Sequence, residues 1–246
     1  MKSVLFCSGG KDSVASLILA KEHGEPLDGV VFCEVMFDKN ISGEHPLHIG
    51  FVMDKLKPFT EKEIGVPFIV LRSDRTYKRF FEHIITKGAG GGKIAGYPLA
   101  GMCAINRDCK MRAVRAFKKA HSIETAYVGI ALDEPERLAR LDGTNQISLL
   151  AKYGITEANA KELCIEYDLL SPVYEINKRN GCWFCPNCGK KEWIWLIKNK
   201  PELFDLLVEL ERKHPHRMRK CLTRDETATE LQARLEVYTQ QLSFFE

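Results

Sequence analysis

Apolar residues occur in short unbroken runs in the first half of the chain, and polar segments with helical spacing separate these runs. The runs predict strands at residues 3–7, 27–36, 68–71 and 125–130. Helices are predicted at residues 11–23, 49–65, 77–85 and 110–120. Unbroken apolarity is typical of strands that are covered on both faces, as in a parallel sheet. The pattern therefore predicts an α/β fold with a doubly wound, mostly parallel sheet.

The pattern changes near residue 170. Short helices are expected at residues 148–153 and 156–167, and Ser171-Pro172 then interrupts the helical spacing. A compact knuckle of cysteines follows at residues 181–188, and amphipathic helices are predicted at 190–198, 203–213 and 227–242. We therefore expect an α/β domain at residues 1–170, and a region at 171–246 that consists of the knuckle and a helical tail.

The first predicted strand runs directly into a loop of unusual composition and then into a helix. The loop reads Ser8-Gly9-Gly10-Lys11-Asp12-Ser13. Two glycines allow a tight turn, and the helix N-terminus adds free N–H groups and the positive end of the helix dipole. The lysine charge and the two serine hydroxyls add further donors. This combination favours a phosphate or pyrophosphate site, but it matches neither the Walker A loop nor the dinucleotide fingerprint.

Other polar positions follow the ends of the predicted strands, where ligands bind in open α/β sheets. Glu34 and Gly129 lie at such ends, and we expect them to face the same crevice as the loop. Arg137 and Arg140 come shortly after Gly129, and arginine there suits a bidentate contact with phosphate or sulfate. The alternative for the two arginines is a solvated helix face. Asp133-Glu134 fits either Mg²⁺ binding or a helix cap.

Nine cysteines are many for a chain without a secretory signal pattern, and five of them fall into two groups. Cys182 and Cys185 have the spacing of metal ligands, and Cys103 and Cys109 form the second pair. Four thiolates can close a zinc site or hold a 4Fe–4S cluster, and spacing does not decide between them. Cys188 is either a spare or the true fourth ligand.

Bulk properties narrow the class of protein only slightly. The net charge of +3 is too small to indicate nucleic-acid binding by itself, although residues 213–220 form a locally basic stretch. A solvated face is the preferred interpretation of this stretch, and contact with a nucleic-acid backbone is the alternative. Because no apolar run of about 18 residues and no signal pattern occur, we expect a cytoplasmic protein without a membrane partner. A homodimer is the candidate assembly.

The six loop residues resemble the signature of the PP-loop superfamily, which is HUP-like in fold and also called adenine-nucleotide alpha-hydrolase-like. Within it, the chain resembles the phosphoadenosine phosphosulfate (PAPS) reductase family over residues 1 to about 190. The similar stretches are Ser8–Ser13, Tyr97–Lys110, Gly129–Arg140 and residues 170–187. The resemblance implies ATP or a related adenine nucleotide at the loop, Arg137 and Arg140 facing that ligand, and Cys103, Cys109, Cys182 and Cys185 at a metal or cluster.

One departure from that family decides between activities. The reductases carry a catalytic cysteine in a Glu-Cys-Gly-Leu-His motif, and this chain has only Cys221 in its tail, without neighbouring glycine or histidine. The leading hypothesis is therefore an enzyme that uses ATP and Mg²⁺, adenylylates a substrate, releases pyrophosphate and serves sulfur or nitrogen transfer. Lys11, Asp12, Arg137 and Arg140 are the candidate catalytic residues. A thiol-dependent sulfonucleotide reductase using Cys221 or Cys188 is the alternative, and a nucleotide-binding protein without turnover is a further one.

Overall fold

The computed structural model describes residues 1–99 and 103–243, and these residues form two compact units. Unit 1 comprises residues 1–34, 45–72 and 111–180, and unit 2 comprises residues 35–44, 73–110 and 181–246. Neither unit is continuous in sequence, because the chain passes between them several times. The sequence predicts a domain boundary near residue 170. The division into two compact units does not test that boundary, which stays a prediction.

Unit 1 contains a five-stranded sheet in which every neighbouring pair is parallel. The strands are β1 (Ser3–Phe6), β2 (Gly29–Glu34), β3 (Phe68–Arg72), β4 (Thr125–Val128) and β5 (Gln146–Ser148), in the order β3-β2-β1-β4-β5. The expected α/β fold with a parallel sheet is confirmed. Four of the strands coincide with the predicted apolar runs.

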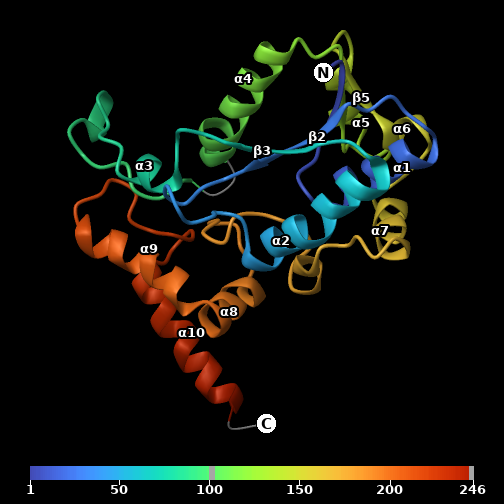
Figure 1. The fold of residues 1–246 in the computed structure, drawn as a ribbon. Helices are drawn as coiled ribbons and strands as arrows, with labels where there is room; N and C mark the ends of the chain where they lie inside the picture. Colours follow the sequence, from blue (N-terminus) through green and yellow to red (C-terminus); the bar gives the residue numbers. More distant parts are fainter. Residues whose placement is uncertain (100–102, 244–246) are drawn as a thin grey trace. The chain divides into compact units, whose positions relative to one another are not determined.

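Helices cover both faces of this sheet, as the apolar runs require. Leu5 and Val30 point into a core that they share with α1 (Lys11–Glu22), α6 (Leu149–Lys152), α7 (Glu157–Glu166) and the helix that begins as α2 (Pro46–Phe51). The alternate residues Val4 and Val31 pack on the opposite face against Phe117 of α4 (Arg112–His121). Figure 1 shows α4 on one side of the sheet and α1 and α2 on the other. Side chains that alternate along each strand thus meet two separate helical layers.

The strand order reverses beside β1, and this reversal creates the position at which α/β sheets bind ligands. From β1 the chain proceeds outward to β2 and β3, and it then returns to place β4 and β5 on the other side of β1. The loops after β1 and β4 leave in different directions from neighbouring strand ends. The Ser8–Ser13 loop follows β1 and Gly129 follows β4, so the sequence signal lies at the switch point of the sheet.

Unit 2 is mainly helical and has its own apolar core. It contains α3 (Tyr77–Phe81), the 3₁₀ turn Gly88–Gly90, and the helices α8 (Lys190–Asn199), α9 (Pro201–Lys213) and α10 (Ala228–Ser243). Phe37, Tyr77, Trp183 and Phe184 stack together in this core. The knuckle therefore contributes its two aromatic residues to the packing of this core.

A buried ion pair joins α9 to the segment that follows it, and the same carboxylate contacts the start of α10. The Glu211 carboxylate contacts Arg217 at 3.0 Å, and both side chains are about as buried as the apolar core. The same carboxylate accepts hydrogen bonds from the Tyr97 hydroxyl and from the amides of Ala228 and Thr229 at the start of α10. Arg217 belongs to the basic stretch 213–220, and it has a buried structural partner instead of lying on a solvated face.

Two elements differ from the sequence expectations near the irregular stretch 94–110. Helical structure begins at Ala104 and includes a π-helix at Asn106–Met111 before α4, so it starts earlier than the expected residue 110. The amide of Asn106 donates to the Cys103 thiol, which helps this turn to begin. In contrast α3 ends at Phe81 rather than at residue 85, because the Phe81 and His83 carbonyls accept from Gly96 and Ala95.

The remaining helices of unit 1 are short, and one strand was not anticipated. The π-helices Val52–Leu56 and Phe59–Ile64 continue α2, while α5 (Pro135–Leu138), the turn Ala139–Leu141 and the turn Pro172–Glu175 are single turns. The edge strand β5 has only three residues, Gln146–Ser148, which is too short for a periodic signal. Thr156 caps the start of α7, where it forms a capping box with Asn159.

Gly129 generates a testable prediction about the switch point. A Cβ atom on Gly129 would lie 2.5 Å from the Ser13 amide nitrogen and 2.7 Å from the Asp12 carbonyl carbon. These are backbone atoms that cannot rotate away, so we expect Gly129→Ala to lower the free energy of unfolding by about 2 kcal/mol or more. Urea denaturation measures this change.

The matched control is Gly50→Ala within helix α2. A Cβ there meets only the Asp54 carboxylate at 3.9 Å, so alanine should stabilise the helix by about 0.5–1 kcal/mol. Equal effects of the two substitutions would contradict the tight packing at Gly129.

Candidate functional site

The Ser8–Ser13 loop folds back on itself through the Ser13 side chain. The Ser13 hydroxyl donates to the Gly10 carbonyl at 2.9 Å and accepts from the Ser8 amide at 3.1 Å. The Gly10 amide donates in turn to the Ser8 hydroxyl at 3.3 Å. Both serines of the predicted loop therefore shape its backbone, and the Ser13 hydroxyl gives its proton to the Gly10 carbonyl.

His48 on α2 holds the loop from outside. Its Nε2 atom lies 2.9 Å from the Ser8 carbonyl oxygen, and its Nδ1 atom lies 3.0 Å from the Ser171 hydroxyl. The Asn180 amide nitrogen donates to the same Ser8 carbonyl at 3.2 Å. Since a carbonyl only accepts, these contacts require a proton on Nε2, so that Nδ1 accepts from Ser171. The ring of His48 is fully buried, which fixes the position of the loop.

The two glycines of the loop are required by their surroundings. Gly9 has φ +73°, and a Cβ there would approach Val52 to 2.7 Å and the His48 ring to 2.8 Å. A Cβ on Gly10 would lie 3.0 Å from the Asn180 side-chain oxygen. A side chain at Gly9 would thus strain the backbone and displace the histidine that supports the loop.

Helix α1 begins at the end of this loop with an N-terminus suited to an anion. Its N-cap residue is Gly10, which has no side chain to occupy the end of the helix. The Lys11 amide donates to the Tyr174 hydroxyl at 3.0 Å. This bond uses a lone pair of the hydroxyl oxygen, so the Tyr174 O–H remains a donor that points its proton elsewhere. We therefore add Tyr174 to the groups that can contact a phosphate here.

Carboxylates surround the ammonium group of Lys11. Its nitrogen lies 2.8 Å from Asp12 and 3.3 Å from Glu157 at the start of α7. Burial opposes the charge on Lys11, but its bonds to Asp12 and Glu157 outweigh that effect and raise the pKa of Lys11. Burial raises the pKa of Asp12, Lys11 opposes this shift, and the charges of Glu157 and Glu134 add to it. Lys11 is therefore a permanent cation. It lies beside a group of carboxylates whose mutual repulsion a bound divalent ion would reduce.

The predicted residues beyond the loop occupy different environments. Glu134 accepts from the Ala131 amide at 3.1 Å and binds Arg137, and its charge acts on Asp12, so this segment lies near the loop. Arg137 and Arg140 are both exposed. Glu34, in contrast, is buried and pairs with Arg72 of the neighbouring strand at 2.8 Å. The arginines and Glu34 stay predicted ligand contacts, and Glu34 has a structural partner in Arg72.

Three of the predicted metal ligands lie together in unit 2. Cys103, Cys182 and Cys185 line one small pocket, whereas the buried Cys109 lines a different cavity. The knuckle is a pair of tight turns, since the Cys185 amide donates to the Cys182 carbonyl and the Cys188 amide donates to the Cys185 carbonyl. Burial, followed by the charges of Glu44 and Cys185, raises the pKa of the Cys182 thiol, and Lys110 opposes this shift.

The donor chemistry of this cluster fits a thiolate-bound metal, but its geometry does not. Within residues 1–99 and 103–243, no three cysteine, histidine or carboxylate side chains are arranged to hold one ion. We therefore derive no chemical step through a metal. The predicted ligand set of Cys103, Cys109, Cys182 and Cys185, with Cys188 as the alternative, stays a prediction.

Sequence reasoning missed the supports of the loop. His48, Ser171, Tyr174 and Asn180 come from three separate segments, and none has a spacing that marks it. Ser171 was noted only as part of a break in helical spacing. A buried histidine before a helical stretch resembles any core residue in sequence, so only the fold reveals its contact with Ser8.

Comparisons with known proteins place few constraints on this chain. No family model matches it, and no curated protein matches it. Among solved structures it is similar to the U34-tRNA thiolase NcsA from Methanococcus maripaludis with its [4Fe-4S] cluster, with 16% sequence identity and a TM-score of 0.45 over 98% of this chain and 72% of that chain. An identity and a TM-score this low support no conclusion about the function of this chain. None of the helices in its described part has the length and hydropathy of a membrane span.

Metal analysis tests the cysteine cluster directly. The spacing predicts that protein purified without oxygen contains zinc or iron in a stoichiometric amount, and that Cys182→Ser loses it. Cys221→Ser is the control, because Cys221 lies in the same unit outside the predicted set. Elemental analysis and the visible absorption spectrum give the readout. Wild-type protein without bound metal would show the prediction to be wrong, and comparison of Cys109→Ser with Cys188→Ser identifies the fourth ligand.

Proposed function

We propose that this chain is a PP-loop enzyme of the PAPS-reductase type that binds ATP at Ser8–Ser13 and releases pyrophosphate. A single observation carries the proposal. A glycine loop that contains a lysine lies at the switch point of a parallel sheet and at the start of a helix, and hydrogen bonds hold its backbone in place. Such a site binds the phosphates of a nucleotide through backbone N–H groups and the helix dipole.

The loop residues have distinct roles in this proposal. The amides of the loop and the first turn of α1 donate to the β- and γ-phosphate oxygens, and Lys11 neutralises the charge that develops on departing pyrophosphate. The Tyr174 hydroxyl donates to a neighbouring phosphate oxygen. Arg137 and Arg140 contact the α-phosphate side, after release of Arg137 from Glu134. Mg²⁺ would neutralise charge on the phosphates of ATP, and the carboxylate of Asp12 would be the protein group that holds it.

The proposed reaction is adenylylation of a substrate atom. A nucleophilic oxygen of the substrate attacks the α-phosphorus, the bond to the bridging oxygen breaks, and pyrophosphate leaves with that electron pair. The resulting adenylate is then open to displacement of AMP by a sulfur or nitrogen nucleophile. The protein contributes mainly position and charge, since both bond changes occur on the substrates.

The acceptor substrate is a part of the proposal that the loop itself does not determine. RNA is the first acceptor to test. The basic stretch at residues 213–220 has contact with a nucleic-acid backbone as its alternative interpretation. No observation favours the reductase alternative, in which Cys188 or Cys221 is the nucleophile. The Cys188 thiol donates to the Cys182 carbonyl within its own turn.

Product analysis with ATP labelled at the α-phosphate tests the proposal. Incubation with Mg²⁺ and total RNA should convert the label to AMP or to an adenylylated product, with one pyrophosphate released for each. Lys11→Ala should lower this rate about a hundredfold or more, because it removes the charge beside the leaving group.

Lys55→Ala is the matched control, since Lys55 is a half-exposed lysine of the same unit that pairs with Asp168 at 2.6 Å. It should keep the wild-type rate. Label that appears in ADP would contradict pyrophosphate release, and an unchanged rate in Lys11→Ala would contradict the role of the loop. Sulfite release from a sulfonucleotide that Cys221→Ser or Cys188→Ser abolishes would establish the reductase instead.

A further inference from the structure

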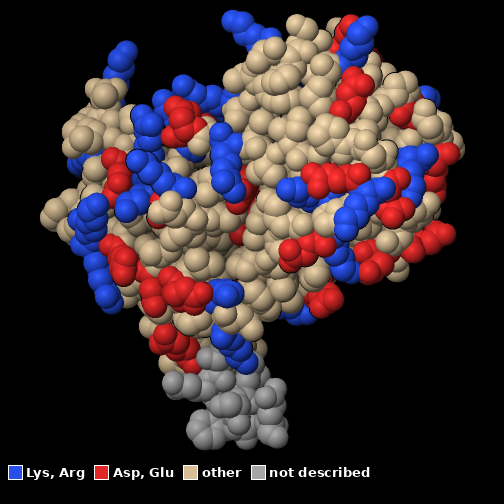
Figure 2. Space-filling model, viewed as in Figure 1, with Lys and Arg blue, Asp and Glu red and all other residues tan. Residues whose placement is uncertain are grey.

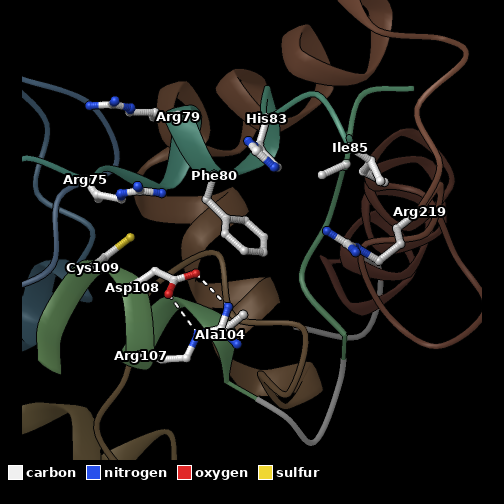
Figure 3. A pocket seen from close by; sticks show the side chains of 11 residues that line it. Arg75, Arg79, Phe80, His83, Ile85, Ala104, Arg107, Asp108, Cys109 and Arg219 are labelled. Carbon is white, nitrogen blue, oxygen red and sulfur yellow. Dashed lines mark hydrogen bonds and ion pairs between the residues drawn. The ribbon is translucent and has the colours of Figure 1, made fainter. Parts of the chain in front are cut away.

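A second cavity lies in unit 2 and is not part of the loop site. Its volume is about 460 Å³, within the range of pockets that bind small molecules. The walls come from residues near α3, from the segment that leads to Cys109, and from the tail at Arg219. Figure 3 shows the polar and aromatic side chains that line it, among them Arg75, Arg79 and Phe80.

Arginine dominates the charge of this cavity. Arg75, Arg79, Arg107 and Arg219 line it, and Asp108 is the carboxylate among its lining residues. Arg107 occupies that carboxylate with two hydrogen bonds of 2.8 Å, which are the dashed lines in Figure 3. Within the described part of the chain, no ion pair joins Arg75, Arg79 or Arg219 to an acidic side chain. Arg75, Arg79 and Arg219 therefore line one cavity whose lining carboxylate, Asp108, is paired with Arg107.

On the face shown in Figure 2, lysine and arginine lie among aspartate and glutamate. Inside the cavity the Nε of Arg75 is buried and has no hydrogen-bond partner. Burial lowers the pKa of Arg219, and its Nε donates to the Tyr97 carbonyl. A buried donor without an acceptor costs free energy unless a ligand supplies the acceptor.

One wall of the cavity is aromatic and apolar. The Phe80 ring lies between the arginines in Figure 3, with the Arg219 guanidinium 5.7 Å from its centroid. The His83 ring and the side chain of Ile85 complete that wall. Guanidinium groups recognise phosphate oxygens through paired N–H donors, and an aromatic ring offers a face for stacking a flat ring. Both elements are present here within a volume that exceeds the needs of a phosphate ion alone.

We propose that this cavity is a binding site for one nucleotide unit, with its phosphate on Arg75, Arg79 and Arg219 and its base against Phe80. The unit is either a free nucleotide or the terminal nucleotide of a strand, since both present the same phosphate and ring. The site is independent of the Ser8–Ser13 loop, because it consists entirely of unit 2 residues.

Calorimetric titration with UMP, uridine and inorganic phosphate tests this assignment. The probes are added to the Lys11→Ala protein, so that loop binding is weakened and failure of the proposed function leaves this result unaffected. UMP should bind, phosphate should bind at least tenfold more weakly than UMP, and uridine should show no measurable binding. A 5′-phosphorylated trinucleotide that binds more tightly than UMP identifies the end of a strand as the ligand.

Variants of the lining residues give the second readout. Arg75→Ala and Arg79→Ala should each weaken UMP binding at least tenfold, and Phe80→Leu should weaken UMP binding but leave phosphate binding unchanged. Arg212→Ala is the control, because Arg212 is an exposed arginine of the same unit outside the cavity. Circular dichroism confirms that each variant folds. If Arg75→Ala does not fold, Arg79→Ala alone provides the test, because Arg79 is the more exposed residue. Uridine binding equal to that of UMP, or wild-type UMP affinity in both arginine variants, would overturn the proposal.

Discussion

The close approach of two backbones at the end of β1 is the constraint on which the candidate site depends. Gly129 leaves no room for even one carbon atom against the first turn of α1. On the other side, Gly9 leaves no room against His48 and Val52. A parallel sheet whose order reverses beside β1 brings these segments together, and the loop acquires its shape from both neighbours.

Hydrogen bonds then make this shape rigid. His48 and Asn180 both bind the Ser8 carbonyl, and Ser171 orients the imidazole from behind. A loop that is fixed before its ligand arrives loses less conformational entropy on binding, so more of the interaction energy remains for affinity and catalysis. These hydrogen bonds also show that residues as distant in sequence as Asn180 hold the loop that ends at Ser13.

Charge at the site follows from the same arrangement. Lys11 contacts Asp12 and Glu157, and Glu134 adds to the negative potential at Asp12. Nucleotide phosphates compete with these carboxylates for the ammonium group. A divalent cation would bind both the phosphates and Asp12. It would thereby offset the repulsion between the phosphates and this carboxylate. The acidic surroundings of Lys11 are thus consistent with a site that receives a nucleotide together with its metal.

Much of this fold follows from periodicity and from local motifs. Apolar runs located four of the five strands, and Ser8–Ser13 with Gly129 located the switch point, because those signals are local in sequence. The strand β5 escaped because three edge residues show no period. Glu34 stays a predicted ligand contact, and its position at a strand end could not reveal its pairing with Arg72 on the next strand. His48, Tyr174 and the arginine cavity depend on contacts between distant segments, which no local pattern encodes.

Titration of isotopically labelled protein with inorganic pyrophosphate, followed by two-dimensional amide NMR, tests the central claim most directly. The loop account predicts that the largest shift changes occur at the amides of Gly9, Gly10, Lys11 and Asp12, with a smaller change at Gly129. Absence of shift changes at millimolar pyrophosphate, or changes confined to residues outside unit 1, would contradict it.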